Sequence, residues 1–178
     1  MSVKKKSKAI EKIITGLYSA NHDEIMKSLK QIPSKGTHEV ILPLLDLYNA
    51  SSSIEVKQKI SEIILQLKDE DCIEPLLDAL KDKKYAEIKN FIISAFWNNN
   101  FDMGNHLNVL TKCAVEGDYL TALEALTVIE NQDGPFDDEM LMDAIVTSRE
   151  YISENKENEK TQLILSLNRV LENFELNQ

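Results

Sequence analysis

Two stretches of this chain share one pattern: HEVILPLL at residues 38–45 and EDCIEPLL at residues 70–77. Each has an isoleucine in its fourth position, a proline in its sixth and two leucines after the proline, so that all four match at one offset. A further step of the same offset reaches Leu107, in a third apolar segment. A fixed period of about 32 residues is typical of proteins that stack one small helical unit many times. The period therefore predicts an architecture, and it leaves the function open.

The composition favours helices and a location in the cytoplasm. With 178 residues, of which 43% are hydrophobic, the chain is long enough for one domain with a substantial core. Five glycines and four prolines are too few for the many tight turns of an all-β protein. No run approaches the ~20 consecutive apolar residues that span a bilayer, and the apolar residues after the basic N-terminus are too interrupted for a signal peptide. We therefore expect a cytoplasmic protein that does not enter a membrane.

The spacing of apolar residues predicts about ten helices along the chain. Short loops place consecutive helices side by side, as five antiparallel pairs. No linker interrupts the pattern, so we expect a single domain over residues 1–178, with residues 1–4 disordered. The second helices of the last four pairs are expected at residues 53–68, 85–97, 118–131 and 157–174. Helix-capping side chains are expected at Asn21, Thr37, Ser52, Asp71, Asp102 and Asp118.

Pro43 and Pro75 raise a question about the geometry of the first helices. A proline inside a helix removes one backbone hydrogen bond and costs ~3 kcal/mol. Either each helix tolerates a kink at its proline, or each helix begins at the proline. Because the expected caps Thr37 and Asp71 lie upstream of the two prolines, we expect the kink.

The central part of the chain resembles HEAT repeats. That family has a proline in the first helix of each pair and a β-branched residue followed by a basic residue early in the second. Here Val56–Lys57 follows Pro43, and Ile88–Lys89 follows Pro75 at the same spacing. The match is specific over residues 37–97 and becomes degenerate outside them.

The resemblance also has departures. Ser51 and Lys83 stand where the family has an aspartate, and the third unit, from Gly104, lacks both the proline and the basic residue. The resemblance implies an all-α, right-handed α–α superhelix that binds other macromolecules along its curved surface, usually on the side lined by second helices. The polar residues expected to face that groove are Glu62, Gln66, Asn90, Ser94, Thr127 and Glu130.

The only tryptophan of the chain, Trp97, lies in an aromatic segment beside a run of three asparagines, Asn98–Asn100. Two interpretations stay open. Trp97 is an anchor for a partner, because buried tryptophans dominate the energies of interfaces. Alternatively, Phe96 and Phe101 belong to the core and Trp97 covers a seam between repeats.

Charge is distributed unevenly along the chain. Residues 101–178 contain 5 Lys or Arg and 16 Asp or Glu, a net charge of −11, whereas residues 1–100 carry +1. Such an acidic half repels phosphate backbones and attracts a basic partner, although it also simply favours solubility. Nucleic acid is therefore an improbable ligand, because DNA-processing helical repeats need a basic groove.

The motifs of metal binding and catalysis are missing from the sequence. His22, His38 and His106 are scattered, and the acidic run Asp137–Glu139 fits the first turn of a helix better than a cation site. No nucleophile motif or phosphate-binding loop occurs, and Cys72 and Cys113 are expected as reduced, buried thiols. We therefore expect no catalytic residue, no metal and no cofactor.

These observations favour a non-catalytic interaction or scaffold module. Its partner is an unidentified protein, with a basic partner favoured, and it binds through the groove or the acidic C-terminal surface. One alternative is a small enzyme that uses carboxylates in the groove. Another is a structural protein that associates with itself as a homodimer, because Phe174 and Leu176 hint at an uncovered apolar end.

Overall fold

The computed structural model describes residues 8–32 and 38–176, and within them every element is helical, without a strand. The fold class is therefore all-α, as the sequence predicts. Two predictions, the disorder of residues 1–4 and the cap at Thr37, lie outside the described residues. The chain divides into two compact units, Met1–Glu87 and Ile88–Gln178, which are described separately below.

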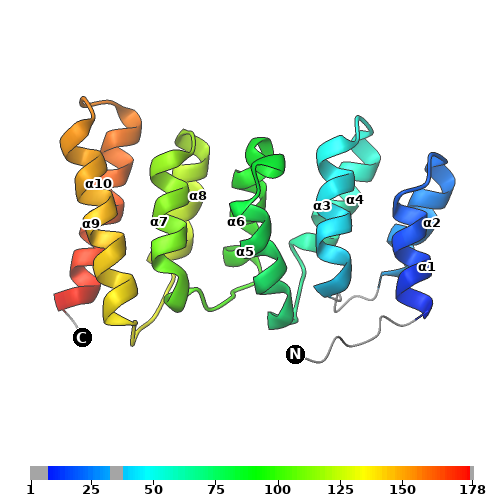
Figure 1. The fold of residues 1–178 in the computed structure, drawn as a ribbon, viewed down its shortest axis with the longest axis horizontal. Coiled ribbons are helices and arrows are strands. Elements are labelled where there is room, and N and C mark those ends of the chain that lie inside the picture. The colour runs from blue at the N-terminus through cyan, green and yellow to red at the C-terminus, as the bar shows by residue number, and fades with distance from the viewer. Residues whose placement is uncertain (1–7, 33–37, 177–178) are drawn as a thin grey trace. The chain divides into compact units, whose positions relative to one another are not determined.

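Unit 1 contains α1 (Lys8–Leu17), α2 (His22–Gln31), α3 (Ile41–Ala50), α4 (Ile54–Ile64) and α5 (Ile73–Lys81). Consecutive helices form the pairs α1–α2 and α3–α4 (Figure 1). In addition, α3 packs against both α1 and α5, and α2 packs against α4. The unit therefore has two layers, one built from α1, α3 and α5 and the other from α2 and α4.

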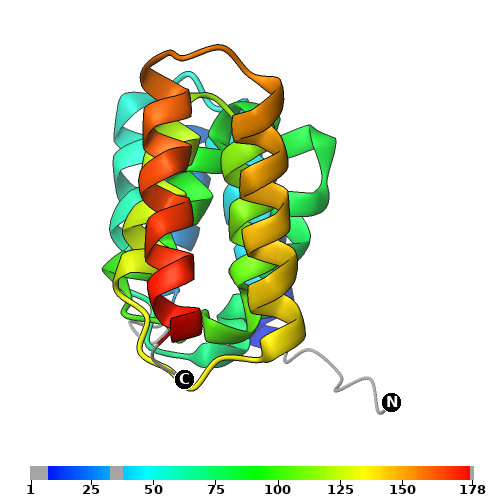
Figure 2. The same ribbon diagram turned by 90° about the vertical axis from the view of Figure 1, so that its left-hand side faces the viewer.

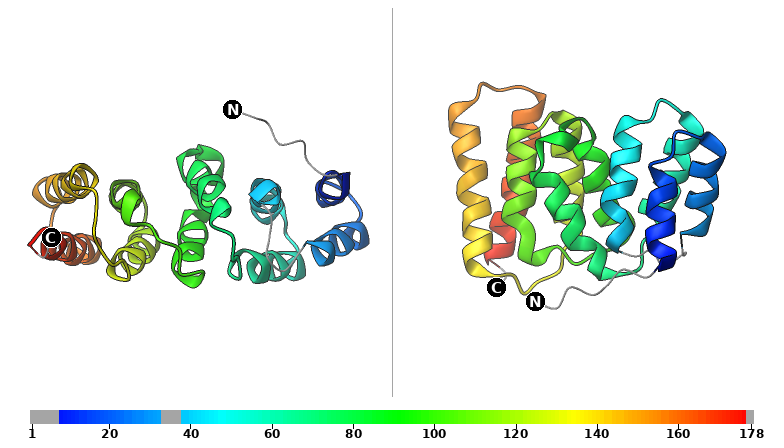
Figure 3. Two further views of the ribbon diagram at one scale, coloured as in Figure 1. Left: turned by 90° about the horizontal axis from the view of Figure 1, so that it is seen from below. Right: turned by 45° about the vertical axis from the view of Figure 1, so that its right-hand side comes forward.

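Unit 2 contains α6 (Lys89–Asn98), α7 (Leu107–Glu116), α8 (Tyr119–Glu130), α9 (Asp138–Glu154) and α10 (Glu159–Leu176). The long helices α9 and α10 lie side by side in Figure 2, and the left view of Figure 3 shows the pairs α7–α8 and α9–α10 end-on. Contacts also join α7 to α9, and α8 to both α6 and α10. This unit thus repeats the two-layer arrangement, with α7 and α9 in one layer and α6, α8 and α10 in the other.

A short 3-10 helix leads directly into three of the first helices. These lead-in turns are His38–Val40 before α3, Glu70–Cys72 before α5 and Gly104–His106 before α7. The first two are separated by the same offset as the matching stretches of sequence, but the third begins two positions later than that offset requires. The second step is therefore two residues longer than the first, so that Leu107, which lies in the third apolar segment as predicted, corresponds to Ile73.

The prolines do not kink their helices. Pro43 and Pro75 are each the third residue of their α-helix, because the preceding turn is 3-10 rather than α-helical. The first four N–H groups of a helix have no intrahelical partner, so a proline there removes no bond. The expected mid-helix kink is wrong, and the alternative of a helix that begins near its proline describes both cases better.

Several caps form as predicted and others are displaced. Asn21 caps α2, since its side chain accepts hydrogen bonds from the N–H groups of Asp23 and Glu24, and Asp118 caps α8. Ser53, not Ser52, accepts from the N–H of Val56 at the start of α4. Asp69, in place of Asp71, caps the lead-in turn at residues 70–72. Asp102 accepts a hydrogen bond from the N–H of Gly104, but the N-cap of that lead-in turn is Met103, which has no side-chain cap bond.

Two second helices are shorter than predicted. α4 ends at Ile64, after which a turn still carries Leu67 into the core. α6 begins at Lys89 because residues 83–88 form a 3-10 segment in which Tyr85 has non-helical dihedral angles. The phenol of the same residue donates a hydrogen bond to the carboxylate of Asp46, a contact described below.

Polar contacts join the helices inside unit 2. The ammonium group of Lys160, at the start of α10, donates hydrogen bonds to the carbonyl oxygens of Val115 (2.8 Å) and Gly117 (2.6 Å) at the end of α7. Between α9 and α10, the buried hydroxyl of Ser148 donates to Asn168 Oδ1 at 2.9 Å. These contacts satisfy carbonyl groups and fix the register of the long helices.

Candidate functional site

The outer face of α8 exposes large apolar side chains. Leu120 and Leu123 are 53% and 38% exposed. The buried face of this helix consists of Thr121, Ala122, Ala125, Leu126, Val128 and Ile129. Because α8 packs against α6, α7 and α10, its inner face carries several small side chains that let neighbouring helices approach closely.

Trp97 lies at the end of α6 and reaches across to α8. Its indole Nε1 donates a hydrogen bond to Glu124 Oε2 at 2.7 Å, and the side chain stays 41% exposed. Phe96 and Phe101 on either side of it are buried in the core. Trp97 is therefore tied in position while one part of its ring system remains in contact with solvent.

Helix geometry places the exposed leucines beside this tryptophan. Leu120, Leu123 and Thr127 share the outer face of α8 with Glu124, the residue that binds the indole. We call Trp97, Leu120, Leu123, Glu124 and Thr127 together the Trp97 surface. It combines three exposed apolar side chains with one carboxylate that already has a hydrogen-bond donor.

Five of the seven predicted site residues lie on or beside this surface. Asn90 and Ser94 precede Trp97 on one line of α6, at the spacing of successive helical turns, and both are half-buried. Ser94 donates to the carbonyl of its own helix at Phe91, so its hydroxyl is engaged locally. Thr127 is half-buried, while Glu130 is exposed at the end of α8.

The other two predicted residues belong to unit 1. Glu62 is exposed on α4 and forms an ion pair with Lys59 at 2.6 Å. Gln66 was predicted inside a helix, but it lies exposed in the turn after the end of α4. Sequence reasoning missed Leu120, Leu123 and Glu124 because, apart from Trp97, it selected only polar positions and did not pair Trp97 with α8.

Unit 2 holds the acidic excess of the chain. Residues 88–178 contain 6 Lys or Arg and 16 Asp or Glu, so this unit carries the whole net charge of −10 and unit 1 is neutral. Three of these acidic residues lie at the start of α9, where the sequence predicted the start of a helix. Asp137 caps the helix, and Asp138 and Glu139 lie in its first turn. A field of this sign extends over a Debye length of about 8 Å at physiological salt and attracts cationic groups.

A polar cluster in unit 1 converges on Asp46. The hydroxyl of Tyr18 donates to Oδ2 at 2.8 Å, while the hydroxyl of Tyr85 and the ammonium of Lys84 both donate to Oδ1. Burial alone would raise the pKa of Asp46, but the hydrogen bonds from Lys84, Tyr85 and Tyr18 outweigh burial and lower that pKa. Burial and the bond to Asp46 raise the pKa of Tyr18 to about 12.

The carboxyl groups with shifted pKa values all favour the ionised form. Besides Asp46, the pKa of Asp118 is lowered, mainly by its hydrogen bonds with Thr121, and the pKa of Glu172 is lowered, mainly by Arg149. A general acid at neutral pH needs the opposite shift. The lowered pKa values keep these three carboxyl groups ionised at neutral pH, in the form that accepts hydrogen bonds from their donors.

The two thiols are poor nucleophiles. Cys72 and Cys113 are both buried and neither forms a disulfide. Burial raises the pKa of Cys72 to about 11, with further contributions from Asp69 and Asp71, and burial also raises the pKa of Cys113. A thiolate is the reactive form of cysteine, so both side chains serve the core.

In residues 8–32 and 38–176, no three metal-binding side chains come together. None of the helices in this described part has the length and apolar character needed to cross a bilayer.

Near the C-terminus, Phe174 packs its ring against Phe136 with centroids 4.4 Å apart, whereas Leu176 is 80% exposed. The predicted apolar end is thus partly covered.

Comparisons with protein-family models, with curated proteins and with solved structures found no match to this chain.

Proposed function

We propose that this chain is a HEAT-like array whose helix pairs form a right-handed α–α superhelix. Two features support the proposal. The lead-in turn recurs at residues 38–40, 70–72 and 104–106, each time directly before a first helix. Inside each unit, helices two apart in the sequence pack together, as α1 with α3 and α8 with α10 do. Such packing is typical of stacked helical pairs.

We propose further that the protein is a non-catalytic interaction module and that it binds a partner protein through the Trp97 surface. The observation that carries this proposal is the exposure of Trp97, Leu120 and Leu123 around Glu124. Exposed apolar side chains that gather in one place, with a polar rim, mark interaction sites on soluble proteins. Tryptophan is also among the residues that contribute most to binding energy when a partner covers them.

The charge of unit 2 favours a basic partner segment. Glu124 lies inside the Trp97 surface and Glu130 lies at its edge, within a unit of net charge −10. A helix or strand that presents apolar residues flanked by Lys or Arg would cover the three apolar side chains and meet the two carboxylates. Complementary charge of this kind raises the association rate and selects the partner more than it raises affinity.

A catalytic role has less support. Asp46, Asp118 and Glu172 have lowered pKa values, and both thiols have raised ones. These directions are the reverse of what an acid and a nucleophile need at neutral pH. The interaction module is therefore the better explanation of the same residues.

The test compares capture of partners from an extract of the native host by three immobilised proteins. The double variant Trp97→Ala, Leu120→Ser should recover at least about tenfold less of a specific partner than the unchanged protein, because it removes two anchors of the surface. The matched control is Ile54→Ser, since Ile54 on α4 is 74% exposed and lies outside the Trp97 surface.

Circular dichroism of each variant checks that the helices are intact. Capture from the extract should also weaken as salt rises, because screening reduces the attraction between opposite charges. Equal recovery by the unchanged protein and the double variant would contradict the proposed surface. Recovery that does not change with salt would contradict the basic partner but leave the apolar anchors in place.

A further inference from the structure

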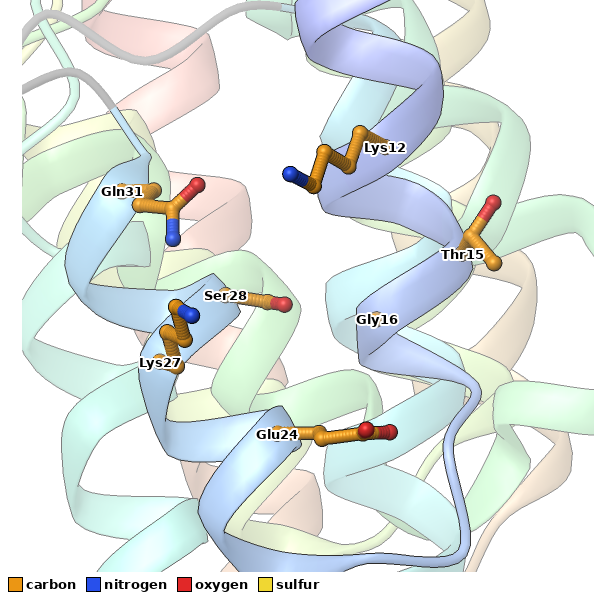
Figure 4. A pocket seen from close by; sticks show the side chains of 7 residues that line it. All are labelled: Lys12, Thr15, Gly16, Glu24, Lys27, Ser28 and Gln31. Carbon is orange, nitrogen blue, oxygen red and sulfur yellow. The ribbon is translucent and has the colours of Figure 1, made fainter.

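A polar hollow lies between α1 and α2 in unit 1, far along the sequence from the Trp97 surface (Figure 4). Its volume is about 310 Å³, at the lower end of the range of small-molecule sites, which is about 300–1,000 Å³. The side chains or backbone of Lys12, Thr15, Gly16, Glu24, Lys27, Ser28 and Gln31 line it. Every lining residue except Gly16 carries a polar group at the end of its side chain, so the hollow offers polar contacts beside the aliphatic stems of its long side chains.

Gly16 and Ser28 form the place where the two helices come closest. A Cβ atom added at Gly16 would lie 1.9 Å from the hydroxyl oxygen of Ser28, so no larger residue fits there without movement. Ser28 is more than nine-tenths buried, and its hydroxyl faces the hollow without a hydrogen-bond partner among the described residues. The hydroxyl itself stays open to solvent, so a ligand atom would replace water as its hydrogen-bond partner.

Two lysines supply positive charge to the hollow. Lys12 comes from α1 and Lys27 from α2, and neither ammonium group forms an ion pair within residues 8–32 and 38–176. Figure 4 shows the ammonium of Lys12 and the amide of Gln31 on the rim of the hollow, extended toward the gap between the helices. Besides the hydroxyl of Ser28, the hollow therefore has two further kinds of hydrogen-bond donor, an ammonium group and an amide group.

One acidic group also lines the hollow. Glu24, in the first turn of α2, accepts a hydrogen bond through Oε2 from the hydroxyl of Ser19 at 2.5 Å. Ser19 lies in the turn that precedes this helix. The charges of Lys12, Lys27 and Glu24 leave the lining with one net positive charge. An anion is therefore favoured over a cation, and Glu24 limits how tightly it binds.

We propose that this hollow binds the phosphate group of a small solute. The ammonium groups of Lys12 and Lys27, the hydroxyl of Ser28 and the amide of Gln31 donate to the phosphate oxygens. Charge-assisted hydrogen bonds of this kind are the strong ones, and lysine is a common phosphate ligand in proteins. Gly16 keeps the hydroxyl of Ser28 accessible. The site is independent of the Trp97 surface, because it uses none of the residues of that surface.

The experiment is a titration of the 15N-labelled full chain with inorganic phosphate and, in parallel, with glycerol phosphate, followed by amide chemical shifts. Sodium chloride keeps the ionic strength constant throughout. Saturable shifts are expected in residues 12–16 and 24–31. If both ligands bind with equal affinity, the phosphate group alone is recognised; tighter binding of the ester indicates additional contacts with the solute. Shifts that chloride reproduces at equal ionic strength would overturn the proposal.

Variants give effects of opposite sign. Lys12→Met and Lys27→Met should each weaken phosphate binding about tenfold, the usual loss for one charge-assisted donor. Glu24→Gln should tighten it severalfold, because it removes the repelling charge and keeps an acceptor for Ser19. Lys30→Met is the matched control, since Lys30 is exposed on the same helix outside the lining, and it should leave binding unchanged.

Two substitutions test the contact between Gly16 and Ser28. Gly16→Ala places a methyl group where the Ser28 hydroxyl lies and should abolish phosphate binding. Because that change also strains the packing of α1 on α2, Ser28→Ala provides the same test without added volume, and it should weaken binding about threefold to tenfold. Phosphate binding that survives in the double variant Lys12→Met, Lys27→Met would overturn the site.

Discussion

In unit 1 the charges cancel, and a single carboxylate, Asp46, joins α1, α3 and the segment after α5. In unit 2 the charges do not cancel, and contacts between helices, such as that of Lys160 with the end of α7, use few of the carboxylates. Unit 1 therefore uses its polar side chains to connect helices. Unit 2 keeps most of its carboxylates, and the three apolar side chains of the Trp97 surface, at positions where a partner can reach them.

The largest expected effect is on the Asp46 cluster. Asp46→Ala should lower the free energy of unfolding of unit 1 by about 3 kcal/mol, because it removes the acceptor of two hydroxyls and one ammonium and leaves Tyr85 buried without a partner. Hydrogen exchange resolved by segment measures the loss in each unit. The control is Asp78→Ala, at the equivalent position of α5, whose exposed pair with Lys81 should contribute less than about 0.5 kcal/mol. Equal losses in both variants would contradict this role.

The corresponding contact of unit 2 should have a smaller effect. Lys160→Met removes two hydrogen bonds to the carbonyl groups at the end of α7 and a contact with the ring of Tyr151, 4.8 Å from the ammonium. We expect a loss of about 2 kcal/mol, seen as faster exchange in α7 and α10. Lys156→Met, in the exposed loop before α10, is the control. Unchanged exchange in α7 would show that the cap contributes nothing.

A substitution at an equivalent position should stabilise unit 2. Thr111 occupies the place of Leu45 and Leu77 in the first helices, and its buried hydroxyl has no hydrogen-bond partner in the described residues. Thr111→Val keeps the shape, removes the hydroxyl and should raise the free energy of unfolding by about 1 kcal/mol in urea denaturation. A loss of stability would mean that the hydroxyl has a partner after all.

The smallest expected effect is a difference in alkaline stability. Tyr18 has a folded-state pKa of about 12, above its ordinary value of 10.0, so the folded state holds this proton more tightly than the unfolded state. Its contribution is fully present below pH 10 and is lost as the pH rises toward 12. The effect is modest because Tyr18 is 59% exposed. Exchange rates in unit 1 should rise across this range, less so in Tyr18→Phe; an identical rise in both proteins would exclude this tyrosine.

The sequence predicted the elements of the fold better than their surfaces. The repeat period located α3 and α5, because proline and leucines recur where helices must begin and pack. It missed the 3-10 lead-in turns, since a proline is compatible with several positions in the first turn. Asp46 could not be predicted as a centre, because its partners Tyr18, Lys84 and Tyr85 are distant in the sequence and meet only after folding.

The outer face of α8 was beyond the sequence for a different reason. Apolar residues occupy both faces of this helix, so periodicity allows two orientations. Packing selects the face that carries Ala122 and Ala125, because α8 has three helical neighbours and these small side chains let them approach. Trp97 was selected because it is the only tryptophan of the sequence. Its hydrogen bond to Glu124, however, depends on which face α8 turns outward.

The lead-in turn also suggests how such a chain can be edited. The third residue of the following helix is Pro43, Pro75 or Val109, and none of these choices disturbs the turn, because that amide has no helical partner. The two additional residues of the third repeat lie before the turn and not inside it. The lead-in turn and the helix after it therefore keep their structure when residues are inserted before the turn. Grafting residues 70–81 before such a turn is therefore a rational way to lengthen the protein by design.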